Sequence, residues 1–194
     1  MKKVAVLLSG CGVFDGTEIH EAVLTLLAIT QAGATYQCFA PDITQMHVVN
    51  HLTGEVNNDE SRNVLVESAR IARGEVLNAN ALEVSQFDAL VIPGGFGAAK
   101  NLSNFATTGS HCHIQPIVEN FIREFALAHK PVGFVCVSPV MIPNIYGKGA
   151  VGTIGTDSDT AHAFNEMGGK HKDAKWKILW LMRPIKSSVR QPIC

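Results

Sequence analysis

Asp88-Ala-Leu-Val-Ile-Pro-Gly-Gly-Phe-Gly97 is the stretch that decides the fold of this chain. A short apolar run that ends in Pro-Gly-Gly is typical of a strand buried on both faces and followed at once by a turn. Similar runs recur along the sequence and alternate with amphipathic stretches, which is the pattern of an α/β protein. Only 17% of the 194 residues are charged and 46% are hydrophobic, as a sheet covered on both faces requires.

The same pattern predicts the other elements. Short links between each strand and the next helix imply parallel strands with right-handed crossovers, and we find no linker or internal repeat. The prediction is therefore a single doubly wound domain with helices on both faces of a mostly parallel sheet. Its expected strands are residues 4–9, 35–40, 88–92, 132–136 and 150–154, and its expected helices are 18–32, 59–72, 115–129, a helix opening near 138, and 159–167.

Composition excludes several classes of protein. The net charge of −1 disfavours a nucleic-acid binder, and no apolar run is long enough to cross a membrane. The five cysteines are odd in number and contain no Cys-x-x-Cys pair, which argues against disulfides and against zinc. His111-Cys112-His113 has no partner cluster, so no metal is expected, and a reducing cytoplasm is the predicted location.

Cys136 is the main candidate for chemistry. It lies in Gly133-Phe-Val-Cys-Val-Ser-Pro139, where an apolar strand is expected to turn into a helix. A nucleophile elbow has this arrangement, and a helix N-terminus favours the thiolate form of a cysteine. The alternative is a buried structural cysteine, which is common in strands. No glycine-rich stretch has the spacing of a phosphate-binding loop.

Several stretches resemble one known group of proteins. Cys136 in its motif, Pro93-Gly-Gly-Phe-Gly97 and the acidic start of the first helix resemble the superfamily of PfpI-type proteases, the parkinsonism-associated deglycase and class I glutamine amidotransferases. Residues 8–22, 50–54, 61–64, 98–105 and 153–157 are similar to its ElbB-like glyoxalase branch. The resemblance covers about residues 1–172 and implies a flavodoxin-like sandwich for that domain.

The resemblance also implies an activity and a set of site residues. The expected reaction is the conversion of glyoxal to glycolate without glutathione or another cofactor, or the related deglycase or aldehyde-scavenging reactions. Cys136 matches the catalytic nucleophile and Glu21 its partner carboxylate. Gly95 and Val137 match the positions whose N–H groups face the substrate oxygen. Gly94 and Glu18 are further candidates for substrate binding, and a plain helix N-terminal acid is the alternative for Glu18. A homodimer is implied as well.

One departure from the wider superfamily narrows the chemistry. Many members supply a histidine after the elbow strand, but Thr153-Ile-Gly-Thr-Asp157 has none. Protease and amidotransferase reactions need a group that protonates a departing amine, whereas aldehyde conversion does not. The alternatives to a glyoxalase are a redox-sensing or chaperone-like binder that uses the same cysteine, and an inactive truncated product.

Residues 173–194 do not match the resembling family. Residues 170–194 carry seven basic side chains and one acidic one, against nine and sixteen in residues 1–169. One codon choice for residues 177–194, read one nucleotide out of step, spells a stretch similar to a hairpin of the family. We therefore predict an aberrant, frameshifted tail at 173–194 and a truncated C-terminal part. A membrane- or nucleic-acid-binding patch is the alternative.

Overall fold

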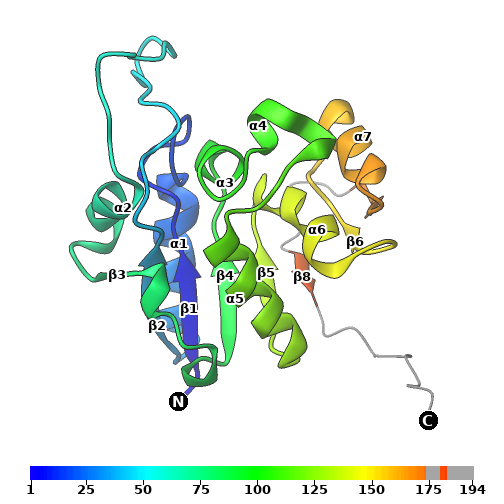
Figure 1. Ribbon diagram of the computed structural model, residues 1–194. Helices are drawn as coiled ribbons and strands as arrows, with labels where there is room; N and C mark the ends of the chain where they lie inside the picture. Colours follow the sequence, from blue (N-terminus) through cyan, green and yellow to red (C-terminus); the bar gives the residue numbers. More distant parts are fainter. Residues whose placement is uncertain (174–179, 183–194) are drawn as a thin grey trace.

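A central sheet with helices on both faces forms the core of the protein (Figure 1). The computed structural model describes residues 1–173 and 180–182. Within them the sheet has six strands in the order β3-β2-β1-β4-β5-β8. Its five parallel strands are β1 (Lys3–Leu7), β2 (Thr35–Ala40), β3 (Val76–Asn78), β4 (Ala89–Ile92) and β5 (Val132–Phe134). This order confirms the doubly wound, flavodoxin-like prediction.

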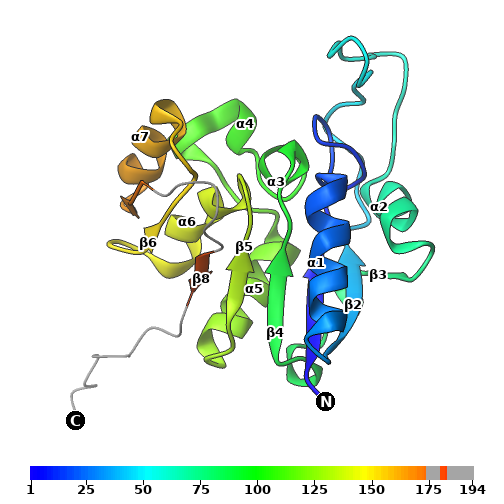
Figure 2. The same cartoon turned by 180° about the vertical axis from the view of Figure 1, so that it is seen from behind.

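The two faces of the sheet are covered by different helices, as Figures 1 and 2 show from opposite sides. α1 (Ile19–Gln31) and α2 (Val64–Ala72) pack on one face, and α5 (Pro116–Leu127) packs on the other. β1 shows why both faces are apolar. Its Ala5 and Leu7 join the cluster of buried residues with α5, whereas Val6 belongs to the cluster with α1 and α2. Successive side chains of one strand point to opposite faces of the sheet, so β1 contributes to two apolar cores.

Short helices cover the end of the sheet at which the parallel strands finish. They are α3 (Phe96–Lys100), α4 (Phe105–Thr108), α6 (Ile142–Tyr146) and the 3-10 helices η3 (Gly109–His111) and η4 (Ser138–Met141). The 3-10 helix η1 (Ala79–Ala81) follows β3, and η2 (Val84–Gln86) precedes β4 at the opposite end of the sheet, where the ammonium group of Lys130 donates to the carbonyl oxygen of Val84. α3 and α4 follow β4, and η4 leads directly into α6 after β5. The sequence predicted neither α3 nor α4, because four or five residues are too short to show a helical period.

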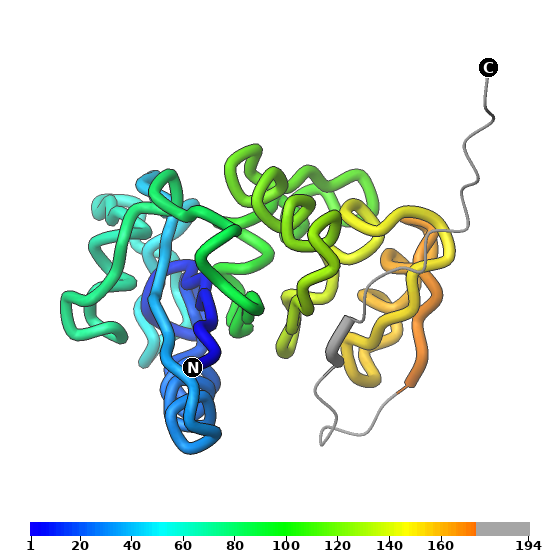
Figure 3. Tube along the Cα trace, turned by 90° about the horizontal axis from the view of Figure 1, so that it is seen from below, coloured from blue at the N-terminus to red at the C-terminus, as the bar shows by residue number. Residues whose placement is uncertain are grey.

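Two predicted elements need correction, and one strand was missed. The strand expected at 150–154 is only β6 (Val151–Gly152), which pairs with β7 (Lys170–His171) in a separate two-stranded sheet. Figure 3 shows this unit and α7 (Ser158–Glu166) at the opposite end of the molecule from the N-terminal strands. α2 begins at residue 64 rather than 59, because the side chain of Asn63 caps it by accepting from the N–H of Val66 at 3.1 Å. The strand β3 was not predicted.

The predicted tail falls almost wholly outside the described residues. Of residues 173–194, the structure describes residue 173 and β8 (Trp180–Met182), which pairs antiparallel with β5. The domain boundary near 172 and the frameshift therefore stay predictions. No helix among the described residues is both long enough and apolar enough to span a membrane.

Candidate functional site

The candidate residues meet where β1, β4 and β5 end. β1 pairs with β2 on one side and with β4 on the other, so the strand order reverses between β1 and β4. Ligands of open parallel sheets bind beyond the strand ends at such a point. Glu21 comes from α1 after β1, Gly94 and Gly95 follow β4, and Cys136 follows β5. The sheet thus brings together residues that are more than 100 positions apart.

Cys136 has a strained backbone. Its φ angle is 58°, in the left-handed region that non-glycine residues rarely adopt. Ser138, which is fully buried, holds this turn: its Oγ accepts from the N–H of Val135 at 2.8 Å, and its hydroxyl has two acceptors within reach, the carbonyl oxygens of Val135 at 2.8 Å and of Ile92 at 3.0 Å. The elbow predicted at Cys136 is therefore present, and the residue is exposed rather than buried in a core.

Gly94 and Gly95 let the backbone after β4 approach the elbow and α1. A Cβ atom on Gly94 would collide with the Cβ of Cys136 and would lie 2.6 Å from Oε2 of Glu21. Gly95 has a φ angle of 93°, and a Cβ atom there would collide with the backbone N of Glu18. A side chain at either position would push apart the segments that form the site, so both glycines are needed for its geometry.

The sulfur of Cys136 has three polar neighbours. The backbone N–H groups of Gly95 and Val137 donate to it, and the carboxyl group of Glu21 shares a hydrogen bond with it. Burial of the sulfur and the negative charge of Glu21 raise the pKa of the thiol, and the two N–H groups lower it by less. The sequence predicted a lowered pKa from the helix N-terminus, and that expectation was wrong because burial of the sulfur, together with the charge of Glu21, outweighs the N–H groups.

Glu21 is half-buried between α1 and the turn after β4. Its Oε2 accepts from the N–H of Gly94 at 3.0 Å. Burial raises the pKa of the Glu21 carboxyl above its ordinary value, and the bonds from Gly94 and Cys136 offset this only in part. A carboxyl with a raised pKa beside a thiol suits proton transfer between the two groups, whose titrations are coupled.

Glu18 caps α1 rather than pointing at the thiol. Its side chain accepts from the N–H of Glu21 at 2.7 Å and pairs with His20 at 2.9 Å. Burial raises the pKa of Glu18, but the hydrogen bonds from His20 and from the Glu21 N–H outweigh it, so the pKa is lowered. His20 itself is 88% exposed. Glu18 therefore acts on the site by holding the start of α1 and adding negative charge next to Glu21.

Two features near the site, the hydroxyl of Ser138 and the loop 41–63, were not predicted from the sequence. The only signal for Ser138 was its place two residues after Cys136 in the quoted motif. The loop, cyan at the top of Figure 1, rises beyond the strand ends. It is tied to the site region by the side chain of Asn101, which accepts from the N–H of Met46 at 2.9 Å. Within the described part of the chain, no group of three or more His, Cys, Asp or Glu side chains is arranged to hold a metal.

Comparison with known proteins places this geometry in a family. An isoprenoid biosynthesis protein with an amidotransferase-like domain from Ehrlichia chaffeensis is 43% identical in sequence. Its crystal structure superposes with a TM-score of 0.82 over 90% of this chain and 79% of that one. The human glutamine amidotransferase-like class 1 domain-containing protein 3 is 46% identical over 178 residues. The chain belongs to this glutamine amidotransferase-like family. That outcome confirms the resemblance found in the sequence.

Other comparisons set the limits of the family assignment. The rat ES1 protein homolog is 47% identical over 178 residues. The matched region covers 87% of this chain but only 66% of the length of the rat and human proteins. Drosophila melanogaster DJ-1beta shares the fold, with a TM-score of 0.51 at 14% identity over 90% of this chain and 75% of that one. No protein-family model matches the chain.

The predicted location in the cytoplasm was wrong. The curated relatives from rat, human and Danio rerio are all named as mitochondrial proteins. The prediction rested on the odd, scattered cysteines, which indicate a reducing environment. Cysteine usage separates reducing from oxidising compartments, and it carries no information that separates one reducing compartment from another.

Proposed function

We propose that this member of the amidotransferase-like family is a glyoxalase that depends on Cys136 and needs no glutathione or other cofactor. The observation that carries the proposal is the contact between the Cys136 thiol and the Glu21 carboxyl, with two backbone N–H groups beside the sulfur. These groups supply a nucleophile, a proton carrier and an oxyanion site. Glyoxal would be converted to glycolate, as a scavenging reaction or as part of a deglycase activity.

The first half of the reaction forms a bond between sulfur and carbon. Cys136 passes its proton to Glu21 and attacks one carbonyl carbon of glyoxal. The N–H groups of Gly95 and Val137 stabilise the oxygen that becomes negative, a contribution of roughly 3–4 kcal/mol for such a donor. Glu21 then returns the proton to that oxygen, which gives a hemithioacetal. Both groups must be close together and partly protonated, and their raised pKa values support this.

The second half moves a proton between the two carbons. The Glu21 carboxylate takes the proton from the carbon bonded to sulfur, which gives an enediol. It then returns a proton to the other carbon, and the product is a thioester of glycolate. Water cleaves the thioester and releases glycolate and the free thiol. The net reaction adds one water to glyoxal, so no external oxidant or reductant is needed.

The surroundings of Cys136 favour an aldehyde over an amide as substrate. Among the described residues, the groups that hydrogen-bond its sulfur are Glu21 and two N–H groups, and none is a histidine. The raised thiol pKa also disfavours the redox-sensor alternative, since such sensors rely on a low-pKa thiolate. The homodimer stays a proposal. The exposed apolar side chains Ile19, Val23, Leu24 and Leu27 on α1 support it, and light scattering measures the mass.

The experiment that tests the function follows carbon-13-labelled glyoxal by NMR. The native protein is expected to give glycolate, and Cys136→Ala is expected to give none. Cys11→Ser is the matched control, because this half-buried thiol has Glu67 and Arg70 of α2 among its charged neighbours rather than Glu21, and its loss should leave the rate unchanged. In heavy water, proton transfer through Glu21 is expected to place one deuterium on the glycolate carbon. Glycolate formation that persists in Cys136→Ala would refute the proposal.

A further inference from the structure

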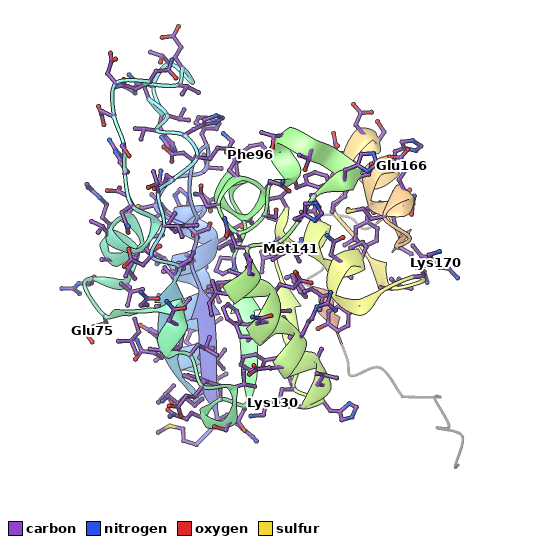
Figure 4. The ribbon with its side chains drawn as sticks, in the orientation of Figure 1. Glu75, Phe96, Lys130, Met141, Glu166 and Lys170 are labelled. Atoms are coloured by element: carbon purple, nitrogen blue, oxygen red, sulfur yellow. The ribbon has the colours of Figure 1, made fainter. Side chains whose placement is uncertain are left out.

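A cavity of about 380 Å³ lies next to the elbow. Val137, whose N–H group donates to the Cys136 sulfur, also lines this cavity. So does Phe96, which directly follows Gly95, the other donor. Figure 4 shows Phe96 at the end of the molecule where the parallel strands finish and the loop 41–63 rises. The cavity is therefore lined by one of the two donor residues and by the neighbour of the other, while Cys136 and Glu21 lie outside its lining.

The walls of the cavity are mainly apolar. Phe14, Phe96 and Phe105 line it together with Val49 and Val56. Phe14, Phe96 and Val56 are 38%, 47% and 40% exposed, which is unusual for large apolar side chains that lie close together. A pocket of this size and lining is typical of sites for small organic molecules, which span roughly 300–1,000 Å³. Glyoxal, with four heavy atoms and two polar carbonyl groups, leaves most of it empty.

The walls are preformed. Val49 and Val56 pair across the loop in an antiparallel bridge, and the N–H of Val49 donates to Oδ2 of the buried Asp15 at 2.7 Å. On the other side, the ammonium group of Lys100 donates to the carbonyl oxygen of Phe14 at 2.7 Å. These bonds hold the aliphatic wall of Val49 and Val56, and the aromatic wall that contains Phe14, in fixed positions next to α3. A rigid apolar pocket binds a matching group without a large loss of chain entropy.

We propose that this cavity holds the apolar substituent of a substituted α-oxoaldehyde, so that the preferred substrates carry an aryl or branched alkyl group. The inference rests on the proposed function, because the aldehyde is the group that Cys136 attacks. The reaction steps are the same as for glyoxal. Sulfur bonds to the aldehyde carbon, the proton of that carbon moves to the ketone carbon through the enediol, and water cleaves the thioester to release the α-hydroxy acid. The substituent takes no part in bond making and contributes binding alone.

A labelling experiment tests the cavity without any turnover. Iodoacetamide and its N-phenyl derivative alkylate thiols by the same reaction, in which sulfur displaces iodide, and differ only in the ring. We compare their rates at Cys136 by peptide mass spectrometry and divide the ratio by that for glutathione. The native protein is expected to favour the phenyl reagent at least tenfold. A ratio within twofold of that for glutathione overturns the inference.

Variants locate the effect in the cavity. Phe96→Ala is expected to reduce the preference for the phenyl reagent to threefold or less. Leu52→Ala is the matched control. This apolar side chain lies in the loop 41–63, between the lining residues Val49 and Val56, but it is 98% exposed and does not line the cavity. Val56→Asp places a charge in the part of the cavity lining that the loop 41–63 supplies, and it repeats the test if Phe96→Ala does not fold. An equal loss in Leu52→Ala would point to a general apolar surface, and would overturn the inference.

Turnover then separates this inference from the proposed function. The ratio of kcat/KM for phenylglyoxal to that for glyoxal is expected to exceed ten and to fall in Phe96→Ala. Conversion of glyoxal with no preference in either experiment rejects the cavity assignment and leaves the glyoxalase proposal standing. Selective labelling by the phenyl reagent with no turnover of either aldehyde rejects the glyoxalase proposal and leaves an apolar binding site next to Cys136.

Discussion

The turns that follow β4 and β5 lie side by side and solve the same backbone problem with different residues. Each has a residue with positive φ, Gly95 at 93° and Cys136 at 58°. After β4 the strain is relieved, because glycine adopts this conformation readily. After β5 it is retained at a side chain that the proposed chemistry needs. An L-residue in this region costs about 1–2 kcal/mol, so the difference marks the position at which the side chain matters more than stability.

The largest effect is expected when the glycine turn is given a side chain. Gly95→Ala combines positive φ with a collision against the backbone of Glu18, and should destabilise the fold by about 3 kcal/mol or more. Gly74→Ala is the control, because Gly74 has a φ of 88° but nothing within 4 Å of an added Cβ atom. Urea unfolding should show that Gly74→Ala lowers the free energy of unfolding by about 1–2 kcal/mol. If the two variants lose the same free energy of unfolding, the collision of an added Cβ atom with the backbone of Glu18 does not contribute to the effect at Gly95.

The next largest effect concerns the support of the cysteine turn. Ser138→Ala removes the hydrogen bonds of this hydroxyl to the N–H of Val135 and to a neighbouring carbonyl, at a cost of roughly 0.5–1.5 kcal/mol for each bond. The N–H of Val135 keeps its bond to the carbonyl of Ile92 at 3.1 Å, so no buried group is left without a partner. Glycolate formation should fall at the same time, because the elbow loses the bonds that hold its φ angle. Ser138→Thr keeps the hydroxyl and separates loss of the hydrogen bonds from other changes at this buried site. A Ser138→Ala variant with full stability and full activity would contradict the role given to Ser138.

A smaller effect of opposite sign is expected at Cys136 itself. Cys136→Gly should abolish activity but stabilise the fold by about 1 kcal/mol, because glycine relieves the strain that the elbow imposes. Cys136→Ala removes the same sulfur and keeps the strain, so its stability should be lower than that of the glycine variant. Urea unfolding of both proteins measures the difference. If the alanine variant is the more stable, the turn after β5 is not strained.

The smallest effect is a change in how stability depends on pH. The Glu21 pKa is raised in the folded state above its ordinary value of 4.5, so the folded chain binds this proton more tightly than the unfolded chain. The contribution to stability is complete below pH 4.5 and is lost as the pH rises through the raised pKa. Glu21→Gln lacks this loss, so the variant should gain stability relative to the native protein over that interval. Urea unfolding at a series of pH values, with Glu75→Gln as an exposed control, measures the difference.

Glu21→Gln also tests how the carboxylate affects the pKa of the Cys136 thiol. Because the charge of Glu21 raises the Cys136 pKa, Glu21→Gln should lower the pH at which iodoacetamide alkylates Cys136. A rise in that pH would mean that Glu21 stabilises the thiolate instead.

Sequence patterns predicted the sheet and the elbow because both depend on local signals. The apolar runs at β1, β4 and β5 end in glycines or in Cys136, and the expected strands lie at or near those residues. The contact of Glu21 with Cys136 had no such signal. The two residues are 115 positions apart, so only the family resemblance connected them. The direction of the Cys136 pKa was missed for the same reason, since the burial and the carboxylate charge that raise it come from other segments.

The strand order has a consequence for how the protein folds. The site needs β1 between β2 and β4, and then β5 beside β4, so its parts come together only after pairings such as Val4 with Ala89 have formed. Pairings this distant in sequence are slow to form, and a growing chain holds no complete site until residue 138 has been made. An alkylating reagent added during refolding would therefore report the last step. Cys136 should react as an ordinary thiol in every partly folded state, and should acquire its altered reactivity only when the sheet is complete.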